Sequence, residues 1–508
     1  MTARDEPAVE PDAPDAAAEP PTRQSVDEAL TAPDAGNRAI RGGVIRVVGF
    51  GAGLFLTALV TPFLLRHLGV DAFGQYTAVV AIVTIVQGLT DAGLTIVGQR
   101  AYVHADAERR RTLLADLLGI RLVLTPIGIL LGVGFAVLAG YPNALVTGTL
   151  LAGVGVVLGV TAAALAMPLS VELRLGAVTA IDFVRQLTLV IGIAVLIVAG
   201  AGLLPFFGTY IAGGAVAVAA ALAFLGTSAW VVPRFSWREW RPLLKESVPV
   251  ALSLVVNTTY VRALIVLCSL LATEHETGLF AASYRISEIL LGVPMMMFGA
   301  AFPILAHAHV ADRDRLAYAL QRMGEASLLV GLLVGLLLAV GAVPAMAVLG
   351  GSEFSGAADA LRIQSVAIAG AFMTGLGTAA LISVHRQREL LLVNLIALLT
   401  VIVLGTTLIP LWGANGAALA ASIGELLLAV TSLTLLIRSQ PDLRPDFHYV
   451  PKLLLAAGAG AACLLLPGSD VIATVAAALV YGAVAWLLRA VPMELVDALV
   501  RRRPLADA

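Results

Sequence analysis

Long apolar segments separated by short polar connections run through most of the chain. Each is about 18 to 28 residues long, the length an α-helix needs to cross roughly 30 Å of hydrocarbon. Barrel strands would be about half as long and would alternate in polarity, which these segments do not. The pattern predicts about fourteen membrane-spanning helices, over residues 43–65, 73–99, 117–139, 144–168, 179–200, 206–232, 247–271, 278–304, 324–349, 357–385, 390–409, 413–437, 451–466 and 470–488.

The remaining segments divide the chain into parts. Residues 1–40 are rich in Ala, Pro, Asp and Glu and hold too few large apolar side chains to offset chain entropy, so we expect a disordered tail. Beyond the tail we expect a six-helix bundle, a linker, a second six-helix bundle, two more helices and a second tail, over residues 41–232, 233–246, 247–437, 438–489 and 490–508.

Basic residues indicate how the chain is oriented. All but four of the 32 Lys and Arg residues fall on one side of the predicted helices. The exceptions are Arg66, Arg262, Arg285 and Arg362. Because positively charged connections stay in the cytoplasm, this asymmetry predicts that both termini are cytoplasmic.

Composition narrows the classes of protein. With 59% hydrophobic and 13% charged residues, the chain cannot be a water-soluble domain. A net charge of −2 gives no reason to expect nucleic acid. Cys268 and Cys463 both lie in apolar segments, so no zinc site is indicated. The only lysines, Lys245 and Lys452, do not complete a phosphate-binding loop, so the chain is not expected to hydrolyse ATP.

A weak repeat relates the two predicted bundles. Residues 65–76 close the first pair of helices, and residues 269–280 place Gly278 and an aromatic side chain at matching offsets in the seventh and eighth helices. The two copies are offset by six helices, an even number, so both have the same orientation. We therefore expect two pseudo-symmetric bundles, related by an axis along the membrane normal, that face each other across a central cavity.

Several stretches resemble one family of transporters. LGVDAFGQY at residues 68–76 is similar to the outer loop of Wzx-type lipid-linked oligosaccharide flippases, polysaccharide exporters of the multidrug/oligosaccharidyl-lipid/polysaccharide (MOP) superfamily. Residues 278–289, with Tyr284 and Arg285 in the middle, resemble the family's eighth helix, and residues 409–418 continue the match. In such proteins an acidic residue often precedes the basic residue of the seventh helix, but here Val261 precedes Arg262.

The resemblance implies an all-α, MOP-like fold in a bacterial cell membrane. It implies a protein that flips a polyprenyl-diphosphate-linked oligosaccharide from the cytoplasmic to the outer leaflet by alternating access. Its partners would be this saccharide, membrane lipids and other glycan-assembly proteins, with no cofactor. Transport would be coupled to H⁺ or Na⁺ or driven by the membrane potential alone. The alternatives are an exporter of peptidoglycan precursors or drugs, a membrane glycan polymerase or glycosyltransferase, and a scaffold that transports nothing.

Two arginines are the main candidates for binding the cargo. Arg262 and Arg285 lie about 10 to 14 Å below the predicted outer surface, at a similar depth on adjacent helices. A charge at this depth is costly, which makes each a functional candidate. Guanidinium groups bind phosphate through two parallel hydrogen bonds, so we expect both to face a wet cavity and hold the diphosphate. The alternatives are that they extend to the surface or pair with Glu288 in a structural bridge.

Other polar residues within the predicted helices have two interpretations each. Glu288, one turn after Arg285, and Asn257 are predicted to line the cavity, and Glu288 could instead be purely structural. Asp91 and Glu425 are candidates for ion coupling, although each could simply hydrogen-bond a neighbouring helix. Arg362 lies close enough to the predicted outer edge to reach water.

Overall fold

The computed structural model describes residues 35–91, 93–226, 231–311, 313–384, 386–465 and 469–491. Within these residues the chain forms helices and no strands. Ten of the helices are long and apolar enough to cross a membrane, so this is a multi-pass membrane protein. Most of the predicted tails, at residues 1–34 and 492–508, lies outside the described residues.

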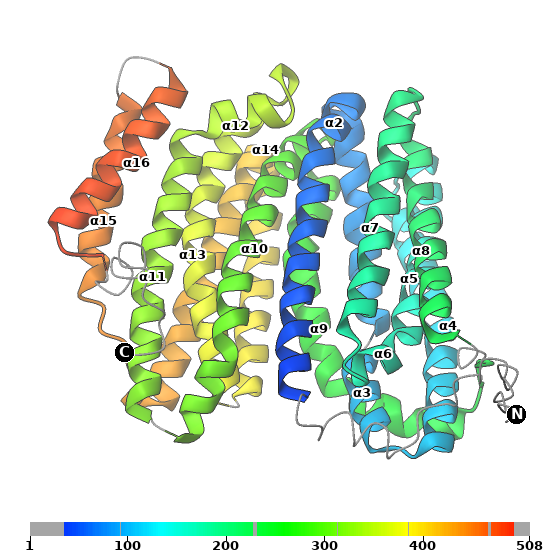
Figure 1. The fold of residues 1–508 in the computed structure, drawn as a ribbon. Helices are drawn as coiled ribbons and strands as arrows, with labels where there is room; N and C mark the ends of the chain where they lie inside the picture. Colours follow the sequence, from blue (N-terminus) through cyan, green and yellow to red (C-terminus); the bar gives the residue numbers. More distant parts are fainter. Residues whose placement is uncertain are drawn as a thin grey trace, which may run out of the picture.

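The helices form two neighbouring groups, with a final pair at one side (Figure 1). The first group contains α2 (Ala35–Asp91), α3 (Leu94–His104), α4 (Ala107–Leu138), α5 (Asn143–Leu165), α6 (Met167–Val171), α7 (Leu175–Val198) and α8 (Leu203–Leu225). The second contains α9 (Trp237–Leu271), α10 (Glu274–Ala311), α11 (Arg313–Val340), α12 (Ala342–Leu349), α13 (Ala357–Ser383) and α14 (Gln387–Ser439). The final pair is α15 (Tyr449–Ala461) and α16 (Asp470–Leu487), and short 3₁₀ turns occur at η2 (Ser352–Phe354), η3 (Pro441–Leu443) and η4 (Ala462–Leu465).

Two long helices are each interrupted by a single glycine. Gly69 in α2 has φ 73° and ψ 177°, and Gly413 in α14 has φ 52° and ψ −127°. A side chain disfavours positive φ, so glycine is suited to both breaks. The sequence predicts a separate helix on either side of each break, which agrees with this geometry, although the total of about fourteen crossings stays a prediction. We call the end of the molecule where α2 breaks the Gly69 end.

Several helices begin earlier than the sequence predicts. The first helix begins at Ala35 instead of residue 43, so the last six residues of the predicted tail are helical. Similarly, α4 begins at Ala107 and α11 at Arg313, about three turns before the predicted starts. The apolar pattern detects only the part of a helix in hydrocarbon, whereas Ala, Arg and Glu favour helix beyond it.

The linker predicted over residues 233–246 is largely part of α9, which runs without interruption from Trp237 to Leu271. Its first turn packs on α4 of the first group. Trp240 is buried there, and Glu239 accepts a hydrogen bond from Arg109 at 3.0 Å. A Cβ on Gly119 of α4 would lie 2.9 Å from the Trp240 ring, so glycine permits this close approach.

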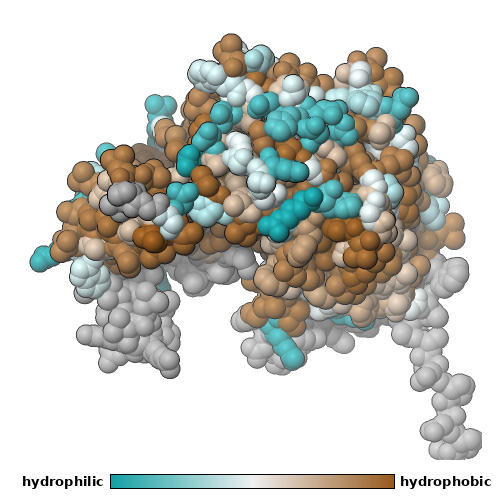
Figure 2. All heavy atoms as spheres, turned by 90° about the horizontal axis from the view of Figure 1, so that it is seen from above, coloured by the Kyte–Doolittle hydropathy of each residue, from teal (hydrophilic) through white to brown (hydrophobic). Residues whose placement is uncertain are grey.

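The two groups contact each other directly at the Gly69 end. A Cβ on Gly278 of α10 would lie 2.0 Å from the carbonyl oxygen of Val70 in α2, so the two backbones touch. Beside this contact, His275 Nδ1 lies 3.1 Å from Asp71 Oδ1. Seen from this end, hydrophilic side chains gather across the face and hydrophobic ones surround it (Figure 2).

Candidate functional site

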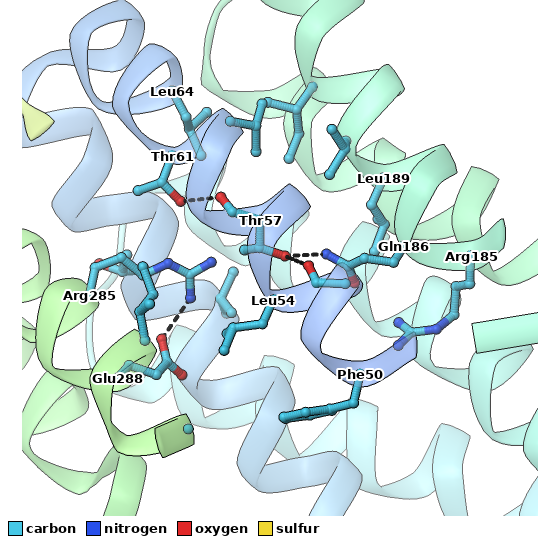
Figure 3. Close-up of a pocket in the computed structure, with 18 of the residues that line it drawn as sticks. Phe50, Leu54, Thr57, Thr61, Leu64, Arg185, Gln186, Leu189, Arg285 and Glu288 are labelled. Carbon is cyan, nitrogen blue, oxygen red and sulfur yellow. Dashed lines mark hydrogen bonds and ion pairs between the residues drawn. The ribbon is translucent and has the colours of Figure 1, made fainter. Parts of the chain in front are cut away.

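A cavity of about 770 Å³ lies between the two groups of helices. Its walls come from α2, α7 and α8 on one side and from α9 and α10 on the other. It extends from Phe73, near the Gly69 end, to Arg46, near the beginning of α2. Figure 3 shows part of the wall, including Thr57 and Thr61 of α2 and Arg285 and Glu288 of α10. The volume is typical of a site for a small organic molecule.

Three charged side chains form one wall of the cavity. Arg262 Nη2 donates to Glu288 Oε1 at 2.7 Å, and Arg285 Nη1 donates to Glu288 Oε2 at 2.6 Å. The side chain of Arg262 is 18% exposed, that of Arg285 30% and that of Glu288 23%. The Nε–H group of Arg262 is buried and has no partner among the described residues. This wall therefore holds two cations, one anion and an unused hydrogen-bond donor.

The helix pair explains why these side chains meet. Arg262 lies nine residues before Leu271, the end of α9, and Arg285 lies eleven residues after Glu274, the start of α10. At 1.5 Å per residue the two are about 14 and 16 Å from that end. The structure therefore places both arginines at the similar depth that the sequence predicts. The arginines line the cavity and also pair with Glu288, while their binding of a diphosphate stays a prediction.

A second charged group on the opposite wall was not identified from the sequence. Arg46 of α2 and Asp182 and Arg185 of α7 line the same cavity. Next to them, the Gln186 side-chain amide donates to the hydroxyl of Thr57. Arg185, Asp182 and Gln186 all lie within the predicted span 179–200, so searching the inner half of each span for charges would have found this group.

Asn257, which was predicted to line the cavity, does not line it. Its amide lies against a different helix and donates to Asn394 Oδ1 of α14 at 3.4 Å. An amide on a helix can point to either side of the helix, and the sequence does not distinguish the two.

Asp91, a candidate for ion coupling, forms an ion pair with a buried arginine. Arg121 Nη2 of α4 donates to Asp91 Oδ1 at 2.6 Å, and Thr95 also donates to this oxygen at 2.8 Å. Arg121 is 4% exposed and donates to the carbonyl of Val160 as well. This arrangement matches the alternative in which Asp91 bonds neighbouring helices, because its charge is already balanced.

Glu425, the other candidate, lies inside the second group of helices. Its Oε2 accepts a hydrogen bond from the Tyr260 hydroxyl at 2.9 Å, and a small cavity of about 80 Å³ lies beside both. Among the described residues no cation pairs with it and no group of three or more metal-ligating side chains occurs. Coupling at Glu425 stays a prediction. Arg362 pairs with Asp359 at 2.9 Å and lies outside the cavity lining.

The fold is shared with known transporters. A structure described as the lipid II flippase MurJ in an inward closed conformation aligns with a TM-score of 0.71 at 11% identity, covering 89% of this chain and 100% of that one. An inward-facing MATE-family multidrug transporter of the MOP superfamily aligns with a TM-score of 0.62 at 13% identity, covering 79% and 99%. The MATE multidrug transporter DinF-BH aligns with a TM-score of 0.58 at 15% identity, covering 82% and 97%.

The predicted MOP-like fold is therefore confirmed, and these structural relatives are transporters and flippases, not enzymes. No curated protein sequence matches the chain. A family model described as polysaccharide biosynthesis protein matches residues 40–309, which is more than half of the sequence and includes both charged walls of the cavity. The chain thus belongs to the polysaccharide biosynthesis protein family.

Proposed function

We propose that this protein flips a polyprenyl-diphosphate-linked oligosaccharide from the cytoplasmic to the outer leaflet of a bacterial cell membrane. The observation that carries the proposal is the wall where Arg262 and Arg285 share the single carboxylate of Glu288. Two guanidinium groups with one carboxylate leave one positive charge and several N–H donors for a further anion. A diphosphate matches both requirements, since arginine binds phosphate bidentately and keeps its charge in any environment.

The cavity and the outer surface suit the two ends of such a cargo. Thr57, Thr61 and Gln186 give the cavity hydroxyl and amide groups that suit sugar hydroxyls. Large apolar side chains on the outside of α2, including Phe55 and Phe63, are more than half exposed in the isolated chain, as expected for contact with lipid. A polyprenyl tail can therefore stay in the bilayer while the polar head group occupies the cavity.

An exporter of peptidoglycan precursors is the second candidate. The structural likeness to a lipid II flippase favours it, whereas the family match favours a polysaccharide precursor. Both cargoes contain a lipid-linked diphosphate, so the arginine wall serves either. The lipid-linked intermediate that accumulates in a deletion strain distinguishes the two.

The test is complementation of a deletion strain with Arg285→Ala. We expect the variant to insert into the membrane and to restore little or no surface glycan, because half of the arginine pair is lost. Arg362→Ala is the matched control, since Arg362 also lies in a spanning helix and pairs with an acid one helical turn away but lies outside the cavity lining. Full complementation by Arg285→Ala would refute the proposal.

A further inference from the structure

The two walls of the cavity carry the same set of charges. One wall has Arg262, Arg285 and Glu288, and the other has Arg46, Arg185 and Asp182. On each wall the acid lies one helical turn from an arginine, as Glu288 does from Arg285 and Asp182 from Arg185. Each wall therefore has an excess of one positive charge.

The two sets differ in how they are bonded. Glu288 is hydrogen-bonded to both of its arginines. On the other wall Asp182 interacts electrostatically with Arg185 and Arg46, but neither arginine side chain makes a hydrogen bond or close ion pair with any described residue. Arg46 and Asp182 are also exposed. An anion that reaches this wall does not have to displace a bonded carboxylate, whereas an anion at Arg262 and Arg285 competes with Glu288.

The arginines also lie at successive depths along the cavity. Arg46 is 23 residues before the break at Gly69, or about 35 Å from that end along the helix. Arg185 is 13 residues before Val198, the end of α7, or about 20 Å. Arg262 and Arg285, at about 14 and 16 Å, are the nearest to the Gly69 end. In Figure 3, Arg185 and Gln186 lie on one side of α2 and Arg285 and Glu288 on the other.

The depth of Arg46 matches the starting position of the cargo. In the orientation expected from the basic residues, the Gly69 end faces outward, so Arg46 lies near the inner surface of the membrane. A lipid-linked diphosphate begins at that level, because its tail is in the inner leaflet and its charge stays among the head groups. The first cations that it meets inside the cavity are then Arg46 and Arg185.

We propose that Arg46 and Arg185, met one after the other along the cavity, form an entry subsite that attracts the diphosphate of the lipid-linked cargo before the diphosphate reaches Arg262 and Arg285. This inference rests on the proposed function and adds a second phosphate-binding position to it. Attraction of the diphosphate by Arg46 and Arg185 sets the rate of association. Binding at the Glu288-bonded pair sets the lifetime of the complex.

The test measures the binding kinetics of geranylgeranyl diphosphate, a lipid diphosphate without sugar, to the full chain in lipid nanodiscs by surface plasmon resonance. For Arg46→Gln/Arg185→Gln we expect association about tenfold slower and less sensitive to salt, with dissociation unchanged, since removing charges along an entry path weakens electrostatic steering. For Arg285→Gln we expect dissociation about tenfold faster. Arg41→Gln is the matched control, because Arg41 is exposed near the start of α2 but does not line the cavity.

Several outcomes would overturn the entry subsite. The first is association of the double variant at the wild-type rate. The second is dissociation of the double variant as fast as that of Arg285→Gln. The third is an equally slow association of Arg41→Gln. A defect seen only with a saccharide-bearing lipid would assign this wall to the sugar instead. If the double variant does not fold, Arg46→Gln alone gives the same test at an exposed position. If Arg285→Gln binds like the wild type, the proposed function itself is refuted.

Discussion

Replacing Glu288 by glutamine separates a binding role of the arginine pair from a bracing role. In the structure the carboxylate occupies donors that a diphosphate would use, with N···O distances of 2.7 and 2.6 Å. The Glu288→Gln side chain keeps nearly the same volume and one acceptor oxygen but loses the negative charge. The variant therefore removes a competitor for the cargo while changing the packing little.

The expected gain follows from the electrostatics of the pair. Two unit charges 4 Å apart interact by about 4 kcal/mol at an effective dielectric constant of about 20. The three side chains are 18% to 30% exposed in a cavity that admits water, which reduces the net effect to about 1 to 2 kcal/mol. Since 1.4 kcal/mol corresponds to about tenfold in a dissociation constant, we expect Glu288→Gln to bind a lipid diphosphate about tenfold more tightly.

Tighter binding should come with slower transport, because the cargo must leave the arginines before it is released. The assay combines equilibrium binding of geranylgeranyl diphosphate to the full chain in nanodiscs with complementation of a deletion strain. The thermal unfolding midpoint, measured in the same nanodiscs, shows whether the variant is intact. Unchanged or weaker binding by a folded Glu288→Gln variant would mean that the carboxylate only braces α9 against α10, and the reasoning would be refuted.

Two further predictions concern the stability of the protein and the contact between the two groups of helices at the Gly69 end. Asp91→Asn leaves the 4% exposed side chain of Arg121 without its counter-ion, so we expect a loss of about 2 to 4 kcal/mol in the free energy of unfolding, measured by denaturant titration in mixed micelles. Gly278→Val places a side chain against the backbone carbonyl of Val70, at which a Cβ would already be 2.0 Å away. We expect that variant to separate the two groups of helices at this end and to abolish complementation.

Each of these predictions has its own control. If Asp91→Asn keeps its stability but transport loses its dependence on H⁺ or Na⁺, Asp91 is a coupling site and not a structural ion pair. For Gly278→Val the control is Gly134→Val in α4, because a Cβ on Gly134 meets nothing within 4 Å. Equal loss of complementation in both variants would show that any added side chain in a spanning helix is harmful and that the contact with Val70 is not special.

Much of the fold follows from the sequence because hydrocarbon imposes a simple length rule on apolar helices. The positions of the breaks near Gly69 and Gly413 could be predicted, since polar and glycine-containing connections interrupt the apolar pattern there. The true helix starts could not, since Ala35 and Trp237 begin helices in segments that water could equally well solvate as a coil. Hydropathy reports where a helix is buried in lipid and does not report where its hydrogen bonding begins.

The candidate site was only half predictable. Depth along the helix identified Arg262 and Arg285, because charge deep in an apolar segment is conspicuous. Arg46 and Arg185 fit the cytoplasmic charge bias, which explains their presence without any site. Asn257 shows the opposite error, since a polar residue in a span can face another helix and not the cavity. The direction of each side chain around the helix depends on tertiary packing, which a single sequence does not specify.

The uninterrupted course of α9 limits how the two halves of the protein can move. Its first turn is anchored to α4 through Trp240, and its later turns carry Arg262 within the other half. The two halves are therefore not joined by a flexible linker at this point. Any reorientation between them must bend α9 itself. Pro242 and Pro249 lie within this helix, and each lacks the amide hydrogen that would stiffen it. The hinge of the transport cycle is therefore expected between Trp240 and Arg262, where bending disturbs the fewest backbone hydrogen bonds.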